Sequence, residues 1–178
     1  MAGMRIEVPA YGAVAIARLY DEFAPKTIAA LRTSLPFTGP GIHAMRAGRE
    51  VFTLIPAPTT DPGAENQSIF PIPGDLYLFH QPEGYRPMEL PAWVRAAKGT
   101  TEYWHIAIWY GRDSFPMSPT GIYPGNHFGE IEDGLKGLAE ACERIRFKGV
   151  KDIRYTIIDT GEEAADADRA NRGVSADE

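Results

Sequence analysis

Hydrophobic residues alternate with polar or small residues in several stretches of the chain, and this period of two predicts β-strands. Residues 8–20 are rich in small and β-branched residues and predict a first strand pair, with a turn at Tyr11-Gly12. Residues 41–55 predict one long strand. Further strands are expected over residues 76–80, 102–109 and 152–159.

Two other stretches follow the helical spacing of three and four residues. The first begins at Pro25, a residue type favoured at the first helical position, and continues with Ile28 and Leu31. The second covers residues 129–147, where apolar residues form one stripe, and Gly149 follows as a C-terminal stop signal. Two helices among many strands predict a mainly β fold, namely a closed and mostly antiparallel β-barrel with two helices.

The predicted strand 41–55 carries the first group of candidate functional residues. Alternation places Arg46, Glu50 and Phe52 on one face and His43 on the other. If the first face lines a cavity, Arg46 would hold a carboxylate through two hydrogen bonds, and Glu50 would accept from N–H groups or act as a base. The alternative for this pair is a surface ion pair. For His43 the alternative is a hydrogen-bonded residue of the core or of the barrel rim.

The strand 102–109 is the most aromatic part of the chain. Glu102 and Tyr110 share one face, while Tyr103 and His105 lie on the other. These residues predict a pocket with aromatic walls and one carboxylate, and burial would raise the pKa of that carboxylate. The alternative is an aromatic barrel core in which the tyrosine hydroxyls find partners at the rim.

Asn126 and His127 are expected to begin the second helix, where Asn126 would cap the helix and the first backbone amides could meet an anion. The histidines and the single cysteine lack the close spacing of metal ligands, so no metal is expected, although a three-histidine site assembled in space stays an open alternative. No nucleotide-binding or serine-esterase motif is present, and no cofactor is expected.

Charge and composition narrow the classes of function. Of the net charge of −6, residues 161–178 contribute −4, from six acidic and two basic residues. We expect these residues to form an acidic disordered tail after a barrel domain over residues 1–160. The remaining sequence has no cluster of Lys or Arg, which disfavours nucleic-acid binding. It has no apolar run of transmembrane length and no secretory signal, and the single Cys142 suits the cytoplasm.

Several short motifs resemble the cyclophilin pattern. Residues 24–28, with the sequence Ala-Pro-Lys-Thr-Ile, are similar to the first cyclophilin helix, and His43 lies where cyclophilins carry a His-Arg pair. A bacterial cyclophilin-like family of unknown function is more similar still. Its pattern is matched by His43-Ala44, Glu65-Asn66, Pro73-Gly74-Asp75, Tyr110-Gly111 and Gly125-Asn126-His127-Phe128. This resemblance extends over roughly residues 4–160 and implies a cyclophilin-like closed barrel.

The resemblance fails at one residue that prolyl isomerases need. Their Arg polarises the prolyl amide and eases rotation about its C–N bond, but Ala44 occupies that position here. At most a weak prolyl isomerase activity is therefore expected. Cyclophilin-like barrels also occur in allophanate- and 5-oxoproline-hydrolysing systems. This analogy of fold implies that the chain is a hydrolase or isomerase that acts on a small cyclic amide or imide.

Under this hypothesis the candidate acid–base residues are Glu102 and Glu50, and His43 or His105 polarises the substrate. Arg46 would anchor a carboxylate. The alternative is a non-catalytic accessory or binding subunit of an enzyme complex. The expected partners are a small-molecule ligand and either a second copy of the chain or a complex partner, with neither nucleic acid nor membrane. The other candidate binding residues are Phe52, Tyr103, Tyr110, Asn126 and His127.

Overall fold

The computed structural model describes residues 2–81, 103–118 and 121–159. Its helices are α1 (Pro25–Arg32) and α3 (Leu135–Lys148), and a short 3-10 turn, η1, covers Pro9–Tyr11. Its strands are β1 (Ala2–Val8), β2 (Ala13–Leu19), β3 (Phe37–His43), β4 (Glu50–Ile55), β5 (Gln67–Ser68), β6 (Asp75–Gln81), β7 (Tyr103–Trp109), β8 (Met117–Ser118), β9 (Gly121–Ile122), β10 (Gly125–Asp133) and β11 (Lys151–Asp159).

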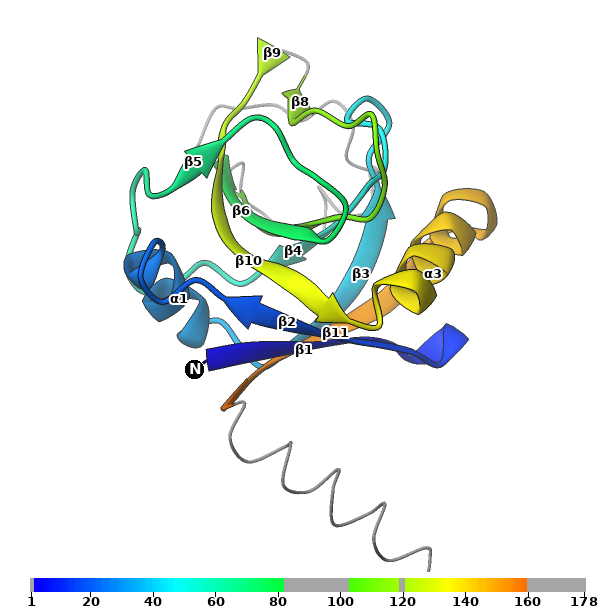
Figure 1. Cartoon of the computed structure of the whole chain (residues 1–178), viewed down its shortest axis with the longest axis horizontal. Coiled ribbons are helices and arrows are strands. Elements are labelled where there is room, and N and C mark those ends of the chain that lie inside the picture. Colours follow the sequence, from blue (N-terminus) through cyan, green and yellow to red (C-terminus); the bar gives the residue numbers. More distant parts are fainter. Residues whose placement is uncertain (1, 82–102, 119–120, 160–178) are drawn as a thin grey trace, which may run out of the picture.

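Eight strands close into an antiparallel barrel (Figure 1). Their order around the ring is β2-β1-β11-β3-β4-β7-β6-β10, and β10 pairs back with β2 to complete it. The short strand β5 pairs with one end of β10, and β8 forms a small hairpin with β9. The predicted mainly β closed barrel with two helices is therefore confirmed.

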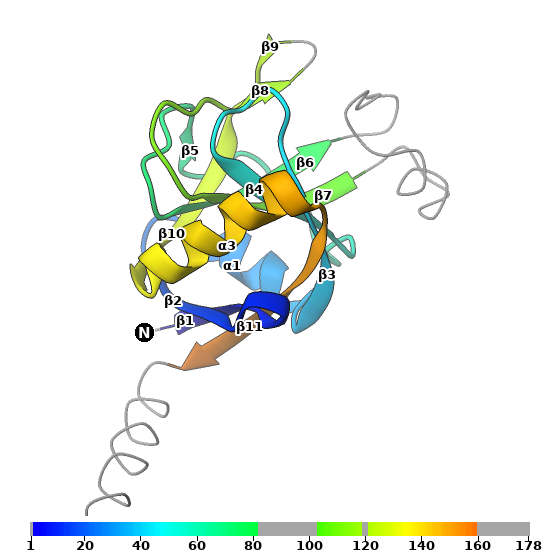
Figure 2. The ribbon, with the colours of Figure 1, turned by 90° about the vertical axis from the view of Figure 1, so that its right-hand side faces the viewer.

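The two helices lie on opposite sides of the barrel. In Figure 1, α1 and α3 flank the ring of strands, and in Figure 2, α3 crosses in front of the barrel while α1 lies behind it. Each helix buries its apolar stripe against the barrel interior, because both contribute to the same hydrophobic core as β1 and β2. The buried helical residues include Ile28 and Leu31 of α1 and Leu138, Cys142 and Ile145 of α3.

The first helix begins at Pro25, as predicted. Its N-cap residue Ala24 has no side chain that could accept from the free amides of the first turn. Glu65 supplies this cap from a distant loop, since its carboxylate accepts from the backbone N–H groups of Lys26 (3.2 Å) and Thr27 (2.7 Å). A negative charge at this end of a helix also interacts favourably with the positive end of the helix dipole.

The prediction of one strand over residues 41–55 is wrong. β3 ends at His43, residues 44–49 form a turn, and β4 runs back antiparallel from Glu50. Gly48 makes this turn possible, because its φ of 89° lies in the left-handed region that other residues avoid. A side chain there would also meet the carbonyl oxygen of Asp113 at 2.8 Å.

The prediction that the second helix spans residues 129–147 is wrong at its start. Residues 125–133 form the strand β10, which pairs with β6 on one side and with β2 on the other. Gly134, with a φ of 75°, then redirects the chain into α3, which ends before Gly149 as predicted. Asn126 and His127 therefore lie in a strand rather than at a helix start.

Candidate functional site

A second hydrophobic cluster lies on the outer face of the barrel, separate from the interior core. We call it the outer-face cluster. Side chains that face each other across paired antiparallel strands point to the same side of the sheet, and the register brings residues of β4, β6 and β7 together there. Its buried members are Ile42, Ala44, Ala47, Phe52, Leu54, Tyr77, Phe79, Tyr103, Ala107 and Trp109, with Tyr123 packed against them.

Two polar side chains are buried on this same face. Glu50 is only 6% exposed and lies directly across from Trp109 in the pairing of β4 with β7. His105 stacks on the ring of Phe79, with ring centroids 4.9 Å apart, and lies 5.2 Å from the ring of Phe52. Burial lowers the pKa of His105 to about 3, so the imidazole is neutral at physiological pH.

Two buried rings on this face, an imidazole and an indole, each have a nitrogen without a hydrogen-bond partner in the described structure. Within the part of the chain that the structure describes, Nδ1 of His105 and Nε1 of Trp109 make no hydrogen bond. The indole N–H of Trp109 can only donate, whereas a neutral imidazole has one donor and one acceptor. The outer-face cluster therefore combines aromatic walls, a carboxylate and two unused ring nitrogens.

Four residues singled out from the sequence lie on the face of the outer-face cluster: Glu50, Phe52, Tyr103 and His105. Trp109 was not among the candidates. Only its register opposite Glu50 identifies it, and that register depends on how β4 pairs with β7. Glu102, the other candidate acid–base residue, lies outside the described residues.

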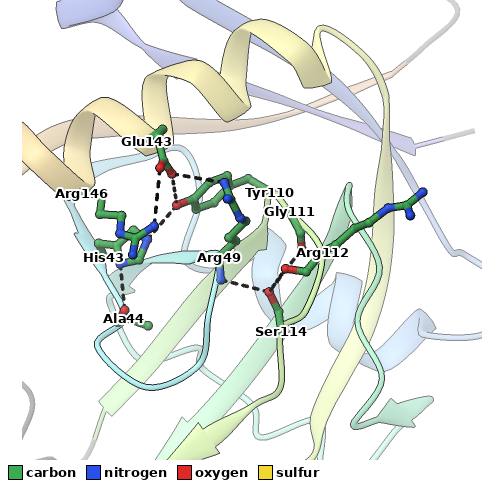
Figure 3. A network of polar contacts seen from close by, with 9 residues as sticks. All are labelled: His43, Ala44, Arg49, Tyr110, Gly111, Arg112, Ser114, Glu143 and Arg146. Atoms are coloured by element: carbon green, nitrogen blue, oxygen red, sulfur yellow. Dashed lines mark hydrogen bonds and ion pairs between the residues drawn. The ribbon is translucent and has the colours of Figure 1, made fainter.

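A second group of predicted residues meets at the α3 side of the barrel (Figure 3). Nε2 of His43 lies 2.8 Å from the hydroxyl oxygen of Tyr110, and that hydroxyl donates to Oε2 of Glu143 at 2.8 Å. Nδ1 of His43 lies 2.7 Å from the carbonyl oxygen of Ala44. Burial lowers the pKa of His43, and burial together with the bond to Glu143 raises the pKa of Tyr110.

Two arginines flank the carboxylate of this network. Arg49 lies 3.6 Å and Arg146 lies 3.5 Å from the oxygens of Glu143 (Figure 3). The backbone N–H of Arg49 also donates to the hydroxyl of Ser114 at 2.9 Å, which ties the turn 44–49 to the segment after β7. These contacts fasten α3 to β7 and to the β3–β4 turn. Glu143 was not identified from the sequence, where it appears only as one more polar residue outside the helical stripe.

Arg46 and Glu50 do not share a strand face. Arg46 is exposed in the turn 44–49, whereas Glu50 is buried at the start of β4. The expectation that Arg46 and Glu50 would hold one ligand together assumed a continuous strand. The turn between β3 and β4 interrupts that strand, so the two side chains do not lie on one strand face. In the pairing of β3 with β4, His43 lies across from Val51. Its side chain therefore points to the inner side of the barrel, whereas that of Glu50, the residue before Val51, points to the outer side.

Asn126 holds a loop in place rather than capping a helix. Its amide donates to the hydroxyl of Thr27 (3.0 Å) and to the carbonyl oxygen of Gly63 (2.8 Å), and its oxygen accepts from the N–H of Glu65 (3.1 Å). His127 lies close to two tyrosine rings and has its Nε2 3.3 Å from Asp75. The expectation that these two residues begin a helix is therefore wrong, because strand pairing places them in β10.

The described residues contain neither a cluster of metal-ligand side chains nor a helix that could span a membrane. Over residues 2–81, 103–118 and 121–159, no three His, Cys, Asp or Glu side chains converge as metal ligands would. Neither of the described helices has the length and the apolar composition needed to cross a bilayer.

The comparison with one solved structure supports the fold. The structure of McbB in complex with tryptophan is similar over 86% of this chain, with a TM-score of 0.58 and 19% sequence identity. The match covers 44% of the McbB chain, so this chain spans less than half the length of that protein. The solution structure of the hypothetical protein AF2241 from Archaeoglobus fulgidus has a TM-score of 0.49 and 18% identity, and the match covers 86% of this chain and 92% of that one.

No curated protein sequence matches the chain. The model of one protein family does match it, and that family is described as "Protein of unknown function (DUF3830)". The match extends from residue 6 to residue 157 and so includes both described helices, six complete strands of the closed barrel, the end of β1 and most of β11. The chain is therefore a member of the DUF3830 family.

Proposed function

We propose that this protein is a cyclophilin-like barrel that binds a small, flat, uncharged polar molecule at the outer-face cluster, and that the ligand is a cyclic amide or imide. One observation carries the proposal: a buried carboxylate, Glu50, lies directly across from a buried indole, Trp109, whose N–H has no partner in the described structure. A cyclic amide offers the complementary groups. Its ring N–H would donate to Glu50, and its carbonyl would accept from Trp109.

The energetics of burial support a ligand at this place. A buried polar group without a hydrogen bond costs about 1–3 kcal/mol. A ligand that pairs with Nε1 of Trp109 would recover this cost on binding. The rings of Phe52 and Phe79 lie beside His105 and would offer flat faces for a planar ligand.

Turnover of the bound amide is the second part of the proposal. A carboxylate close to a ring N–H or to a water molecule can act as a general base. Glu50 is the residue for this role, and His105, held neutral by burial, would donate or accept one hydrogen bond without carrying charge. Binding without turnover would favour the alternative of a non-catalytic subunit.

Prolyl isomerisation is disfavoured by the surroundings of Ala44. The resemblance to cyclophilins predicts the catalytic guanidinium at this position, and Ala44 instead packs its methyl group into the outer-face cluster. A standard proline-peptide isomerisation assay is therefore expected to show no acceleration above the uncatalysed rate.

Calorimetry and thermal-shift measurements with four ligands test the proposal. Hydantoin and succinimide represent the uncharged class, 5-oxoproline adds a carboxylate, and tryptophan is included because McbB was solved with it. We expect an uncharged ring to bind to the wild-type protein and to bind at least about tenfold more weakly to Glu50→Gln and to Trp109→Phe, which corresponds to about 1.4 kcal/mol.

Glu132→Gln is the matched control, because it makes the same chemical change at an exposed glutamate paired with Arg18. This variant should bind as the wild-type protein does. The proposal would be overturned if none of the uncharged rings bound, or if both outer-face variants retained full affinity while remaining folded by circular dichroism.

A further inference from the structure

A cavity of about 220 Å³ opens at one end of the barrel, beside β5 and β6. Pockets for drug-sized ligands measure roughly 300–1,000 Å³, so this cavity suits a smaller molecule. Its lining comes from the loop before β5 and from β5, β6, β7, β10 and the segment before β10. The residues are Asp61, Gly63, Ala64, Gln67, Leu78, His80, Trp104, Tyr123, Pro124 and Asn126.

The walls of this cavity are held in place by contacts within the protein. The ring of His80 stacks on that of Trp104 with centroids 4.0 Å apart and planes 4° from parallel. The hydroxyl of Tyr123 donates to the carbonyl oxygen of His80. Asn126 uses its whole amide to join Thr27, Gly63 and Glu65. A cavity with fixed walls needs little rearrangement when a ligand enters.

The charge of the lining favours a cation. Asp61 carries a carboxylate into the lining, and none of the described lining residues is Lys or Arg. Oδ1 of Asp61 accepts from the backbone N–H of Gly63 at 2.7 Å, and Oδ2 lies 3.5 Å from Nδ1 of His80. A carboxylate has about four acceptor positions, so these two contacts leave capacity for a further donor.

We propose that this cavity binds a small organic amine through Asp61. The ammonium group would donate to the oriented carboxylate of Asp61, while a short apolar body would lie against Leu78, Trp104 and Pro124. Apart from Tyr123, which also packs against the outer-face cluster, the lining of this cavity is separate from that cluster. Leu78 and Trp104 point to the inner side of β6 and β7, and the alternation of a strand places Phe79 and His105 on the other side.

Benzylamine and benzyl alcohol form a matched pair of probes, because they share shape and size but only the amine is charged at pH 7.5. We expect benzylamine to bind in calorimetric titrations and to change the tryptophan fluorescence of the protein, because Trp104 lines the cavity. Benzyl alcohol should bind at least about tenfold more weakly. Equal binding of the two probes would overturn the proposal, as would the absence of benzylamine binding at millimolar concentration.

Asp61→Asn tests the assigned residue with little risk to the fold, because the asparagine oxygen can still accept from Gly63. This variant should lose at least about tenfold in affinity for benzylamine. Asp152→Asn is the control, because it removes the same charge at an exposed residue of β11. Retained binding in Asp61→Asn, or equal loss in both variants, would contradict the proposal. Either result leaves the outer-face proposal standing, because that proposal is judged by the binding of the uncharged rings hydantoin and succinimide.

Discussion

The hydroxyl of Tyr110 lies 2.8 Å from Nε2 of His43, although the two residues are 67 positions apart in the chain. Nδ1 of His43 faces the carbonyl oxygen of Ala44, which can only accept, so Nδ1 carries the proton of the neutral ring and Nε2 is an acceptor. The carboxylate of Glu143 is a second acceptor for the same hydroxyl. The hydroxyl has one proton, so His43 of β3 and Glu143 of α3 compete for it as acceptors.

Removing this hydroxyl is expected to weaken the attachment of α3 to the barrel. Tyr110→Phe keeps the ring but leaves His43 and Glu143 without their shared partner. We expect the free energy of unfolding to fall by about 1–3 kcal/mol, measured by urea denaturation, because one of the lost bonds involves a charged group. Tyr11→Phe is the control. It keeps the contact of this ring with Arg144, and it should change stability by less than about 0.5 kcal/mol.

Acid should destabilise the protein through His105. Its folded pKa is lowered to about 3, whereas an unfolded histidine titrates near its ordinary value of 6.5. Between these values the unfolded state binds the proton and the folded state does not, so stability falls as pH decreases from 6.5 toward 3. One such group contributes a slope of up to about 1.4 kcal/mol per pH unit.

His105→Phe should remove this contribution, because a phenyl ring can occupy the same stack beside Phe79 without titrating. Urea denaturation at several values between pH 6.5 and pH 4 measures the slope. His43, whose pKa is also lowered, contributes in the same direction, so the variant should have a reduced slope rather than none. An unchanged slope in a folded variant would show that His105 does not carry this effect.

Two glycines close together in the chain should respond oppositely to alanine. At Gly134 the φ is 75°, and an added Cβ would lie 2.2 Å from the carbonyl oxygen of Val14 and 2.9 Å from Cα of Ala15. Gly134→Ala should therefore cost at least about 2 kcal/mol of stability. Gly137 lies within α3 with open space around it, and Gly137→Ala should stabilise by about 0.5–1 kcal/mol. Thermal denaturation of the two variants distinguishes these outcomes.

The thiol of Cys142 should be unreactive in the folded protein. It is fully buried on α3, and burial raises its pKa to about 12, so very little thiolate forms at neutral pH. Modification by a thiol reagent should be at least about a thousandfold slower under native conditions than in concentrated guanidinium chloride. Since Cys142 is the single cysteine, the reaction reports it without ambiguity. Rapid native modification would mean that α3 leaves the barrel easily.

Sequence patterns predicted the parts of this fold whose signals are local. Pro25 marks the start of α1 and Gly149 follows the end of α3, because backbone restrictions and helix caps act within a few residues. The predictions failed at residues 44–49 and 129–133. There the apolar spacing suits more than one element, and the pairing with distant strands decides which one forms.

The sequence by itself determined a mainly β barrel with two helices. It also identified four residues on the face of the outer-face cluster and two of the network beside α3, namely Glu50, Phe52, Tyr103, His105, His43 and Tyr110. Only the tertiary structure decided which of them meet. The pairing of β4 with β7 places Glu50 across from Trp109, and the packing of α3 brings Glu143 to Tyr110 and His43. These contacts join residues far apart in the chain, and the register and helix packing that create them depend on the whole barrel rather than on neighbouring residues.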